Sequence, residues 1–169
     1  MLIFAAAMAL LAPADHPGMP MADGFVVGYR QTAQMGAIEE RVPRGETVQD
    51  WSRMVTLLTM NVDMTPEAYL DAFARQIATA CPGATVGPRT ASITGAYKSL
   101  DGRTDCALNP GTGKPETFFY RIFAAGGRLY MAQVAFRRVA NASDAAWARS
   151  QLSGLRLCAV SATDAVCTL

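Results

Sequence analysis

A short segment near the N-terminus carries side chains that can bind a soft metal ion. His16, Met19 and Met21 lie close together and offer one imidazole and two thioethers. If a leader ending at Ala14 is removed, the new α-amine of Asp15 joins them. Such nitrogen and sulfur ligands suit copper. The alternative interpretation is a flexible, proline-rich leader whose methionines are incidental.

The second group of reactive side chains is the cysteines. They do not form a C-x-x-C pair, so zinc binding and thioredoxin-type chemistry are poorly supported. An even number of cysteines in an exported chain predicts two disulfides. We favour Cys81–Cys106 with Cys158–Cys167, because each pair closes a short loop. The other two pairings stay open, and so does the alternative of four buried thiols if the chain is not exported.

The segment Glu39–Arg53 combines a Pro-Gly turn, mixed charges and a tryptophan, a mixture that suits partner contacts. The candidate residues for binding a partner or ligand are Glu40, Arg44, Trp51 and Arg53. Two structural alternatives remain open. The ring of Trp51 can pack as a lid on one face of a sheet, because large aromatic side chains dominate burial energetics. The charges can form an ordinary solvated edge.

No arrangement of residues predicts an active site. His16 is the single histidine and lies in the expected leader, whereas a catalytic base must be held in a rigid site by a third group. We therefore assign no catalytic residue and no cofactor, and a hydrolase that uses Ser, Asp or Tyr remains the alternative. The net charge of +1 without a basic cluster argues against a nucleic-acid partner.

The N-terminal sequence predicts where the protein works. Residues 1–14 are an uncharged apolar run that ends in Ala-Pro-Ala, as in a secretory signal peptide. A bilayer needs about 20 apolar residues, so this run is too short to span one. We expect a periplasmic or secreted protein with no transmembrane helix in the mature chain. A buried N-terminal helix is the alternative. No Lys or Arg precedes the run, which leaves open a true start codon elsewhere.

The remaining sequence predicts one domain with short flanking segments. Residues 15–24 contain two prolines and two glycines and predict a flexible tether. Residues 25–157 form the domain, and residues 158–169 form a C-terminal tail. Extended segments are predicted at Phe25–Gly36, Ala37–Val42 and Arg53–Met60. Thr47, with Asp50 three residues later, is expected to open a short helical turn that carries Trp51.

Helix and turn signals continue along the chain. Thr65-Pro66 begins a helix that Pro82-Gly83 ends. Asp101-Gly102 and Gly126-Gly127 predict two hairpin turns. The second turn places Phe118, Tyr120 and Ile122 on one face with Leu129 and Met131, and Phe119 and Phe123 on the other with Tyr130 and Val134. Both faces are apolar, so both need cover. Ser143 is expected to cap a last helix, Asp144–Leu155.

The segment E-E-R-V-P-R-G-E-T-V-Q-D-W-S-R-M-V-T, residues 39–56, resembles the E-x-V-P-x-G-E-x-x-x-x-W-x-x-M-x-T stretch of small secreted bacterial proteins of unassigned function. The order of elements over residues 24–157 is similar to the PsbP-like sandwich of DcrB-type periplasmic proteins. The resemblance implies an α+β fold, with a mostly antiparallel sheet and helices on both faces. The chain departs from the family in its four cysteines and in lacking a lipobox cysteine.

The same resemblance implies a non-enzyme, because members of that superfamily are chiefly binding or accessory subunits. We therefore expect a non-catalytic exported protein that binds an unknown protein or small ligand. The alternatives are a hydrolase of unrecognised type and copper binding through the mature N-terminal leader.

Overall fold

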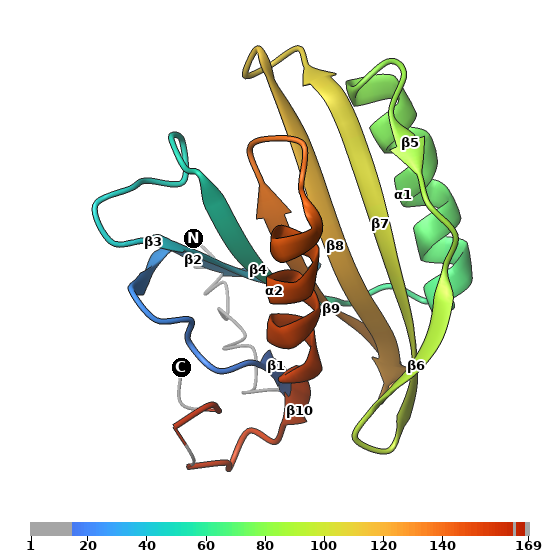
Figure 1. Ribbon diagram of the computed structural model, residues 1–169. Helices are drawn as coiled ribbons and strands as arrows, with labels where there is room; N and C mark the ends of the chain where they lie inside the picture. Colours follow the sequence, from blue (N-terminus) through green and yellow to red (C-terminus); the bar gives the residue numbers. More distant parts are fainter. Residues whose placement is uncertain (1–14, 164, 168–169) are drawn as a thin grey trace, which may run out of the picture.

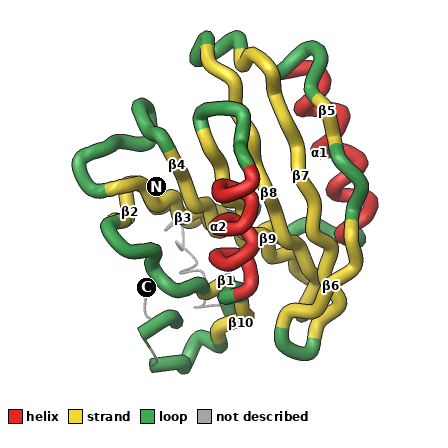
Figure 2. The backbone as a smooth tube through the Cα atoms, in the orientation of Figure 1, coloured by secondary structure: helices red, strands yellow, loops and turns green. Residues whose placement is uncertain are grey.

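The computed structural model describes residues 15–163 and 165–167, and the predicted signal peptide lies outside the described residues (Figures 1 and 2). An eight-stranded antiparallel sheet dominates the molecule. Its strands, in spatial order, are β2 (Phe25–Ala33), β3 (Gly36–Pro43), β4 (Arg53–Met60), β9 (Arg128–Phe136), β8 (Lys114–Ala125), β7 (Tyr97–Asn109) and β5 (Thr85–Val86), and β6 (Thr90–Thr94) also pairs with β7. The helices are α1 (Pro66–Ala80) and α2 (Ala142–Ser153), and β1 (His16–Gly18) pairs with β10 (Arg156–Cys158).

The expected α+β sandwich, with helices on both faces of the sheet, is wrong. Strands hold 47% of the described residues and the two helices only 18%, so the molecule is mostly antiparallel β-sheet. The physical reason is the length and number of the strands: β7 has 13 residues and β8 has 12. A single helix is too narrow to cover a sheet of this width. Irregular chain around Met19 and Leu155 completes the core beside α2.

The segment predicted as a helix from Thr65-Pro66 is α1, and this prediction is confirmed. The Thr65 hydroxyl accepts a hydrogen bond from the backbone N–H of Ala68, and Pro66 occupies the first turn, where a missing N–H costs nothing. Leu70 is the fully buried residue of the helix. It packs with Tyr120 and Ile122 of β8, so α1 lies against the β7–β8 side of the sheet (Figure 1).

The predicted β8–β9 hairpin is also confirmed, including its register. Gly126 and Gly127 both adopt positive φ angles, as a tight two-residue turn requires. Phe119 lies opposite Val134, and Ile122 lies opposite Met131. The alternating side chains form two apolar clusters, one on each face of these strands.

The hairpin predicted at Asp101-Gly102 is wrong, because β7 runs through both residues without a turn. The chain instead reverses at Gly95, whose φ is +58°. Inside β7, Gly102 lies opposite Tyr120, and Asp101 lies opposite Arg121. A Cβ on Gly102 would come within 2.2 Å of the Tyr120 hydroxyl oxygen. The glycine therefore serves a close side-chain approach in the strand, not a reversal of the chain.

Two helix predictions also need correction. The last helix is capped by Asn141, not Ser143, and it ends at Ser153. Asn141 and Asp144 form a reciprocal capping box, and the Arg138 hydrogen bond lowers the pKa of Asp144. The segment around Thr47 forms bends instead of a helical turn, although its hydroxyl still accepts a hydrogen bond from the N–H of Asp50.

Residues 15–24, expected to be a flexible tether, are tied to the domain. His16–Gly18 pairs with β10 as β1, and Met19 is 1% exposed within the core beside α2. Gly18 packs directly on a disulfide, since a Cβ there would lie 2.3 Å from the sulfur of Cys158. The wrong expectation arose because prolines and glycines predict loops and say nothing of what a loop packs against.

The cysteines form two disulfides, Cys81–Cys106 and Cys158–Cys167, which is the pairing that the sequence favours. The first joins the end of α1 to β7. The second closes the C-terminal segment against β1. Two disulfides fit an extracytoplasmic location.

Candidate ligand-binding pocket

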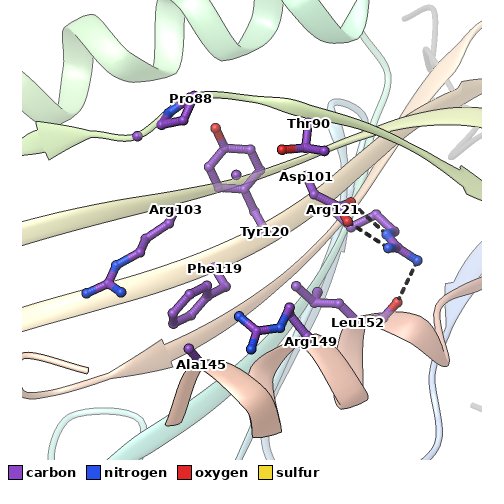
Figure 3. A pocket seen from close by; sticks show the side chains of 12 residues that line it. Pro88, Thr90, Asp101, Arg103, Phe119, Tyr120, Arg121, Ala145, Arg149 and Leu152 are labelled. Atoms are coloured by element: carbon purple, nitrogen blue, oxygen red, sulfur yellow. Dashed lines mark hydrogen bonds and ion pairs between the residues drawn. The ribbon is translucent and has the colours of Figure 1, made fainter. Parts of the chain in front are cut away.

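A cavity of about 480 Å³ lies between α2 and the strands β7 and β8 (Figure 3). We call it the α2 pocket. This volume falls within the range of ligand-binding pockets, about 300–1,000 Å³. The pocket is lined by Gly87, Pro88, Thr90, Asp101, Gly102, Arg103, Phe119, Tyr120, Arg121, Ala145, Arg149 and Leu152.

The pocket exists because two short strands share the outer edge of β7. β5 pairs with Thr104 and Asp105, and β6 pairs with residues 97–101 of the same strand. Residues 87–89 cross the gap between the two strands. The N–H of Gly87 donates to the carbonyl of Arg103, but Pro88 has no N–H to continue the ladder. The sheet edge is therefore interrupted beside the pocket.

Tyr120 forms the end of the pocket that faces this interrupted edge. Its ring lies over Gly102 and extends toward Pro88 and Thr90 (Figure 3). The residue is 1% exposed, and burial raises the pKa of its phenol. A phenol with a raised pKa stays neutral and can donate a hydrogen bond.

Arg121 joins the sheet to α2 across the pocket. Its Nε and Nη2 donate to the two carboxylate oxygens of Asp101, each at 2.7 Å. Its Nη1 donates to the carbonyl of Leu152 at 3.2 Å, in the last turn of α2. A cation suits the C-terminal end of a helix. Because all three nitrogens are bound within the protein, Arg121 serves mainly to position α2.

Arg103 is held in a similar way on the opposite side of the pocket floor. Its Nε and Nη2 donate to the carboxylate of Asp105, both at 2.7 Å, and its guanidinium lies 5.2 Å from the centre of the Phe119 ring. Burial opposes ionisation of Asp105. The hydrogen bonds from Arg103 and Thr117 outweigh that effect and lower the pKa of this carboxyl.

Arg149 differs from the other two arginines because it has no ion-pair or hydrogen-bond partner among the described residues. It is exposed on α2 and projects beside Phe119 and Leu152 (Figure 3). The pocket therefore has one cation at its mouth whose charge no acidic side chain offsets.

These groups can bind a ligand, but they offer little for proton transfer. Asp101 is the one carboxylate among the lining residues described, and it already accepts hydrogen bonds from Arg121 and from the hydroxyl of Ser92. Arginine does not lose its proton in proteins, and Tyr120 holds its own more tightly than usual. The lining thus supplies donors and apolar surface without a free base.

The four residues predicted to bind a partner or ligand do not lie together. Glu40 and Arg53 lie on opposite faces of the sheet, and burial raises the pKa of Glu40. The guanidinium of Arg53 lies 5.0 Å from the ring centre of Trp147, and that of Arg137 lies 4.2 Å from the ring centre of Trp51.

Trp51 is half-buried, and the remaining residue, Arg44, is exposed in the loop after β3. A binding role for these four residues stays a prediction.

The three predicted copper ligands lie in different environments. His16 is half-buried, with its Nε2 atom 3.0 Å from the carbonyl oxygen of Cys167. Met19 is buried in the core, and Met21 is 45% exposed. Within the described residues, no group of three or more His, Cys, Asp or Glu side chains can hold a metal ion.

The sequence analysis missed the pocket residues, although one signal was present. Arg121 lies between Phe119 and Phe123, so it projects from the same apolar strand face. A charge in that position needs a partner, and the partner is Asp101 on the next strand. Because the pattern Asp101-Gly102 predicts a turn, it does not indicate that Asp101 pairs with Arg121.

No family model and no curated protein match this chain. Among solved structures, LpqN, which is involved in cell envelope biogenesis of Mycobacterium tuberculosis, is similar with a TM-score of 0.45 and 11% identity. The alignment covers 88% of this chain and 87% of LpqN. At this TM-score the likeness carries no functional argument, and the predicted PsbP-like family is not confirmed. In the described part of the chain, neither helix is long and apolar enough to cross a membrane.

Proposed function

We propose that this chain is a non-catalytic protein of the periplasm or extracellular space that binds a small molecule in the α2 pocket. The observation that carries the proposal is the cavity of about 480 Å³ itself, which combines apolar walls with a few polar groups. Ligand sites have this composition, because apolar surface supplies affinity and a few polar groups set orientation.

Hydrogen bonds between the two sides of the pocket support the proposal. Its two sides are joined by the Arg121 bridge between Asp101 and the end of α2. Its floor consists of paired strands, in which Phe119 and Tyr120 are buried. A preformed pocket binds with less loss of conformational freedom than one that must be assembled on binding.

The test is a fluorescence titration with the uncharged dye N-phenylnaphthylamine, comparing the natural protein with Ala145→Leu and Ala146→Leu. Ala145 lines the pocket, whereas Ala146 is the next residue of α2 and is exposed. We expect Ala145→Leu to weaken dye binding at least about tenfold by filling the pocket, and Ala146→Leu to bind as the natural protein does. Equal binding by all three proteins, with unchanged circular dichroism, would contradict the proposal.

A further inference from the structure

We propose that the ligand of the α2 pocket is an amphipathic organic anion, with its headgroup on Arg149 and its apolar body against Phe119 and Leu152. This inference rests on the proposed function and adds the chemical class of the ligand. The charges, the apolar surface and the hydrogen-bonding groups of the lining support it.

The charges of the lining do not balance. Three arginines line the pocket with a single acid, Asp101. Asp101 offsets Arg121, and Asp105 offsets Arg103 from outside the lining. Arg149 remains as the excess positive charge at the mouth. A cationic ligand would be repelled here, whereas a carboxylate or phosphate group would complete the pattern that the two internal ion pairs already show.

The apolar part of the pocket lies next to Arg149, deeper in the cavity than its exposed side chain. Phe119 is 7% exposed and Leu152 is 3% exposed, and the small side chain of Ala145 on α2 lies beside Phe119 (Figure 3). Pro88 lies at the sheet-edge end of the pocket, and the ring of Tyr120 lies there on the opposite side of β8 from Phe119 (Figure 3). A bare inorganic anion would leave this surface in contact with water, so the geometry favours a ligand that carries an apolar body.

The remaining polar groups favour the same ligand class. Thr90 adds a hydroxyl at the end of the pocket away from Arg149, where the Tyr120 phenol, whose pKa is raised by burial, lies on the α1 side of the sheet. Guanidinium groups only donate hydrogen bonds, and the carboxylate of Asp101 among the described lining residues already accepts them from Arg121 and Ser92. The lining therefore offers no free carboxylate to a cationic headgroup, which leaves Arg149 as the charged group available to a ligand.

Isothermal titration calorimetry with decanoate below its micelle concentration tests the inference, with decanol and inorganic phosphate as comparison ligands. We expect decanoate to bind at least about tenfold more tightly than decanol or phosphate, and added salt to weaken its binding. Arg149→Gln should weaken decanoate binding roughly tenfold without changing decanol binding. The matched control is Arg75→Gln on exposed α1, which removes the same charge elsewhere and should change affinity less than about twofold.

The possible failures are distinguishable. If decanol binds as tightly as decanoate and Ala145→Leu blocks both, the pocket binds small molecules but the anion inference is wrong. If Arg149→Gln binds decanoate as well as the natural protein does, the headgroup assignment is wrong. If phosphate alone binds as tightly as decanoate, the apolar body contributes nothing and the inference is overturned. If no organic probe binds and Ala145→Leu changes nothing, the proposed function itself fails.

Discussion

Glu39 shows how a single buried charge can hold two segments together. It is 5% exposed, and both Arg30 and Arg41 form ion pairs with it. Burial opposes its ionisation, but the hydrogen bonds from the two arginines outweigh that effect and lower its pKa. Arg41 also donates to the carbonyl of Met19 at 2.7 Å. The acid on β3 thus fixes, through Arg41, the N-terminal segment that fills the core.

The lowered pKa predicts how stability depends on pH. A carboxyl whose folded pKa is depressed stabilises the fold above the ordinary pKa of Glu, about 4.3, and loses this contribution as the pH falls through the folded value. We expect Glu39→Gln to cost roughly 3–5 kcal/mol at neutral pH, because it leaves buried Arg41 without its charge partner. Urea unfolding between pH 7 and pH 3 should also show a shallower acid dependence. Glu67→Gln, at the exposed start of α1, is the control. An unchanged acid profile would contradict the role of Glu39.

The close contact between Gly102 and Tyr120 gives a second prediction about a single residue. Its Cβ would lie 2.2 Å from the Tyr120 hydroxyl oxygen, so Gly102→Ala must displace a buried ring. We expect a loss of roughly 1–3 kcal/mol in the free energy of unfolding. In a Tyr120→Leu background the same substitution should cost little, because the clash is gone. A double-mutant cycle measures the difference, and purely additive costs would refute the explanation.

At the scale of elements, the sequence was most informative where the signal was local. Thr65 and Pro66 define the start of α1 through one hydroxyl and one missing N–H, both of which are visible in the sequence. Gly126 and Gly127 define the β8–β9 turn and with it the whole register. Asp101-Gly102 has an equally clear turn pattern. That pattern is misleading because the partners of both residues lie on a neighbouring strand, about twenty positions later.

The pocket could not be predicted for the same reason. Arg149 lies on α2 and Arg103 on β7, and no local pattern brings these residues together. The gap beside Pro88 depends on how β5 and β6 divide the edge of β7, which only the folded sheet decides. The lack of a catalytic motif and the PsbP-like resemblance favoured a binding protein over an enzyme, but neither indicated where a ligand would bind.

Removal of each disulfide should have a different effect, because the two disulfides join different elements. Cys81–Cys106 spans 25 positions, and Cys158–Cys167 spans 9. The chain-entropy model gives losses of about 3.5 and about 2.6 kcal/mol when each pair is replaced by alanine. Only the second replacement removes the sulfur atoms on which Gly18 packs. We expect it alone to expose residues 15–24 to limited proteolysis. Equal cleavage of both variants in this segment would contradict the assignment.

At the scale of the whole molecule, stability is concentrated in the middle of the sheet. β9 pairs with β4 on one side and with β8 on the other, and it contributes to both apolar clusters. Leu129, Met131 and Val134 are all 0% exposed. β2 lies at an edge and pairs only with β3, and its residues after Val26 are exposed. The α2 pocket lies at the other side of the sheet, beside the divided edge of β7.

This arrangement predicts a gradient of amide hydrogen exchange across the sheet, which two-dimensional NMR can measure. Amides of β9 should exchange only through global unfolding, since both neighbouring strands must separate first. Those of β2 that donate hydrogen bonds to β3 should exchange through local opening, roughly a thousandfold faster or more. Low denaturant provides the control, because exchange through global unfolding accelerates with denaturant and exchange through local fluctuations does not. If β2 and β9 exchange at the same rate and with the same denaturant dependence, the sheet unfolds as one unit. The edge strands would then be as stable as the centre, contrary to the distribution of buried side chains.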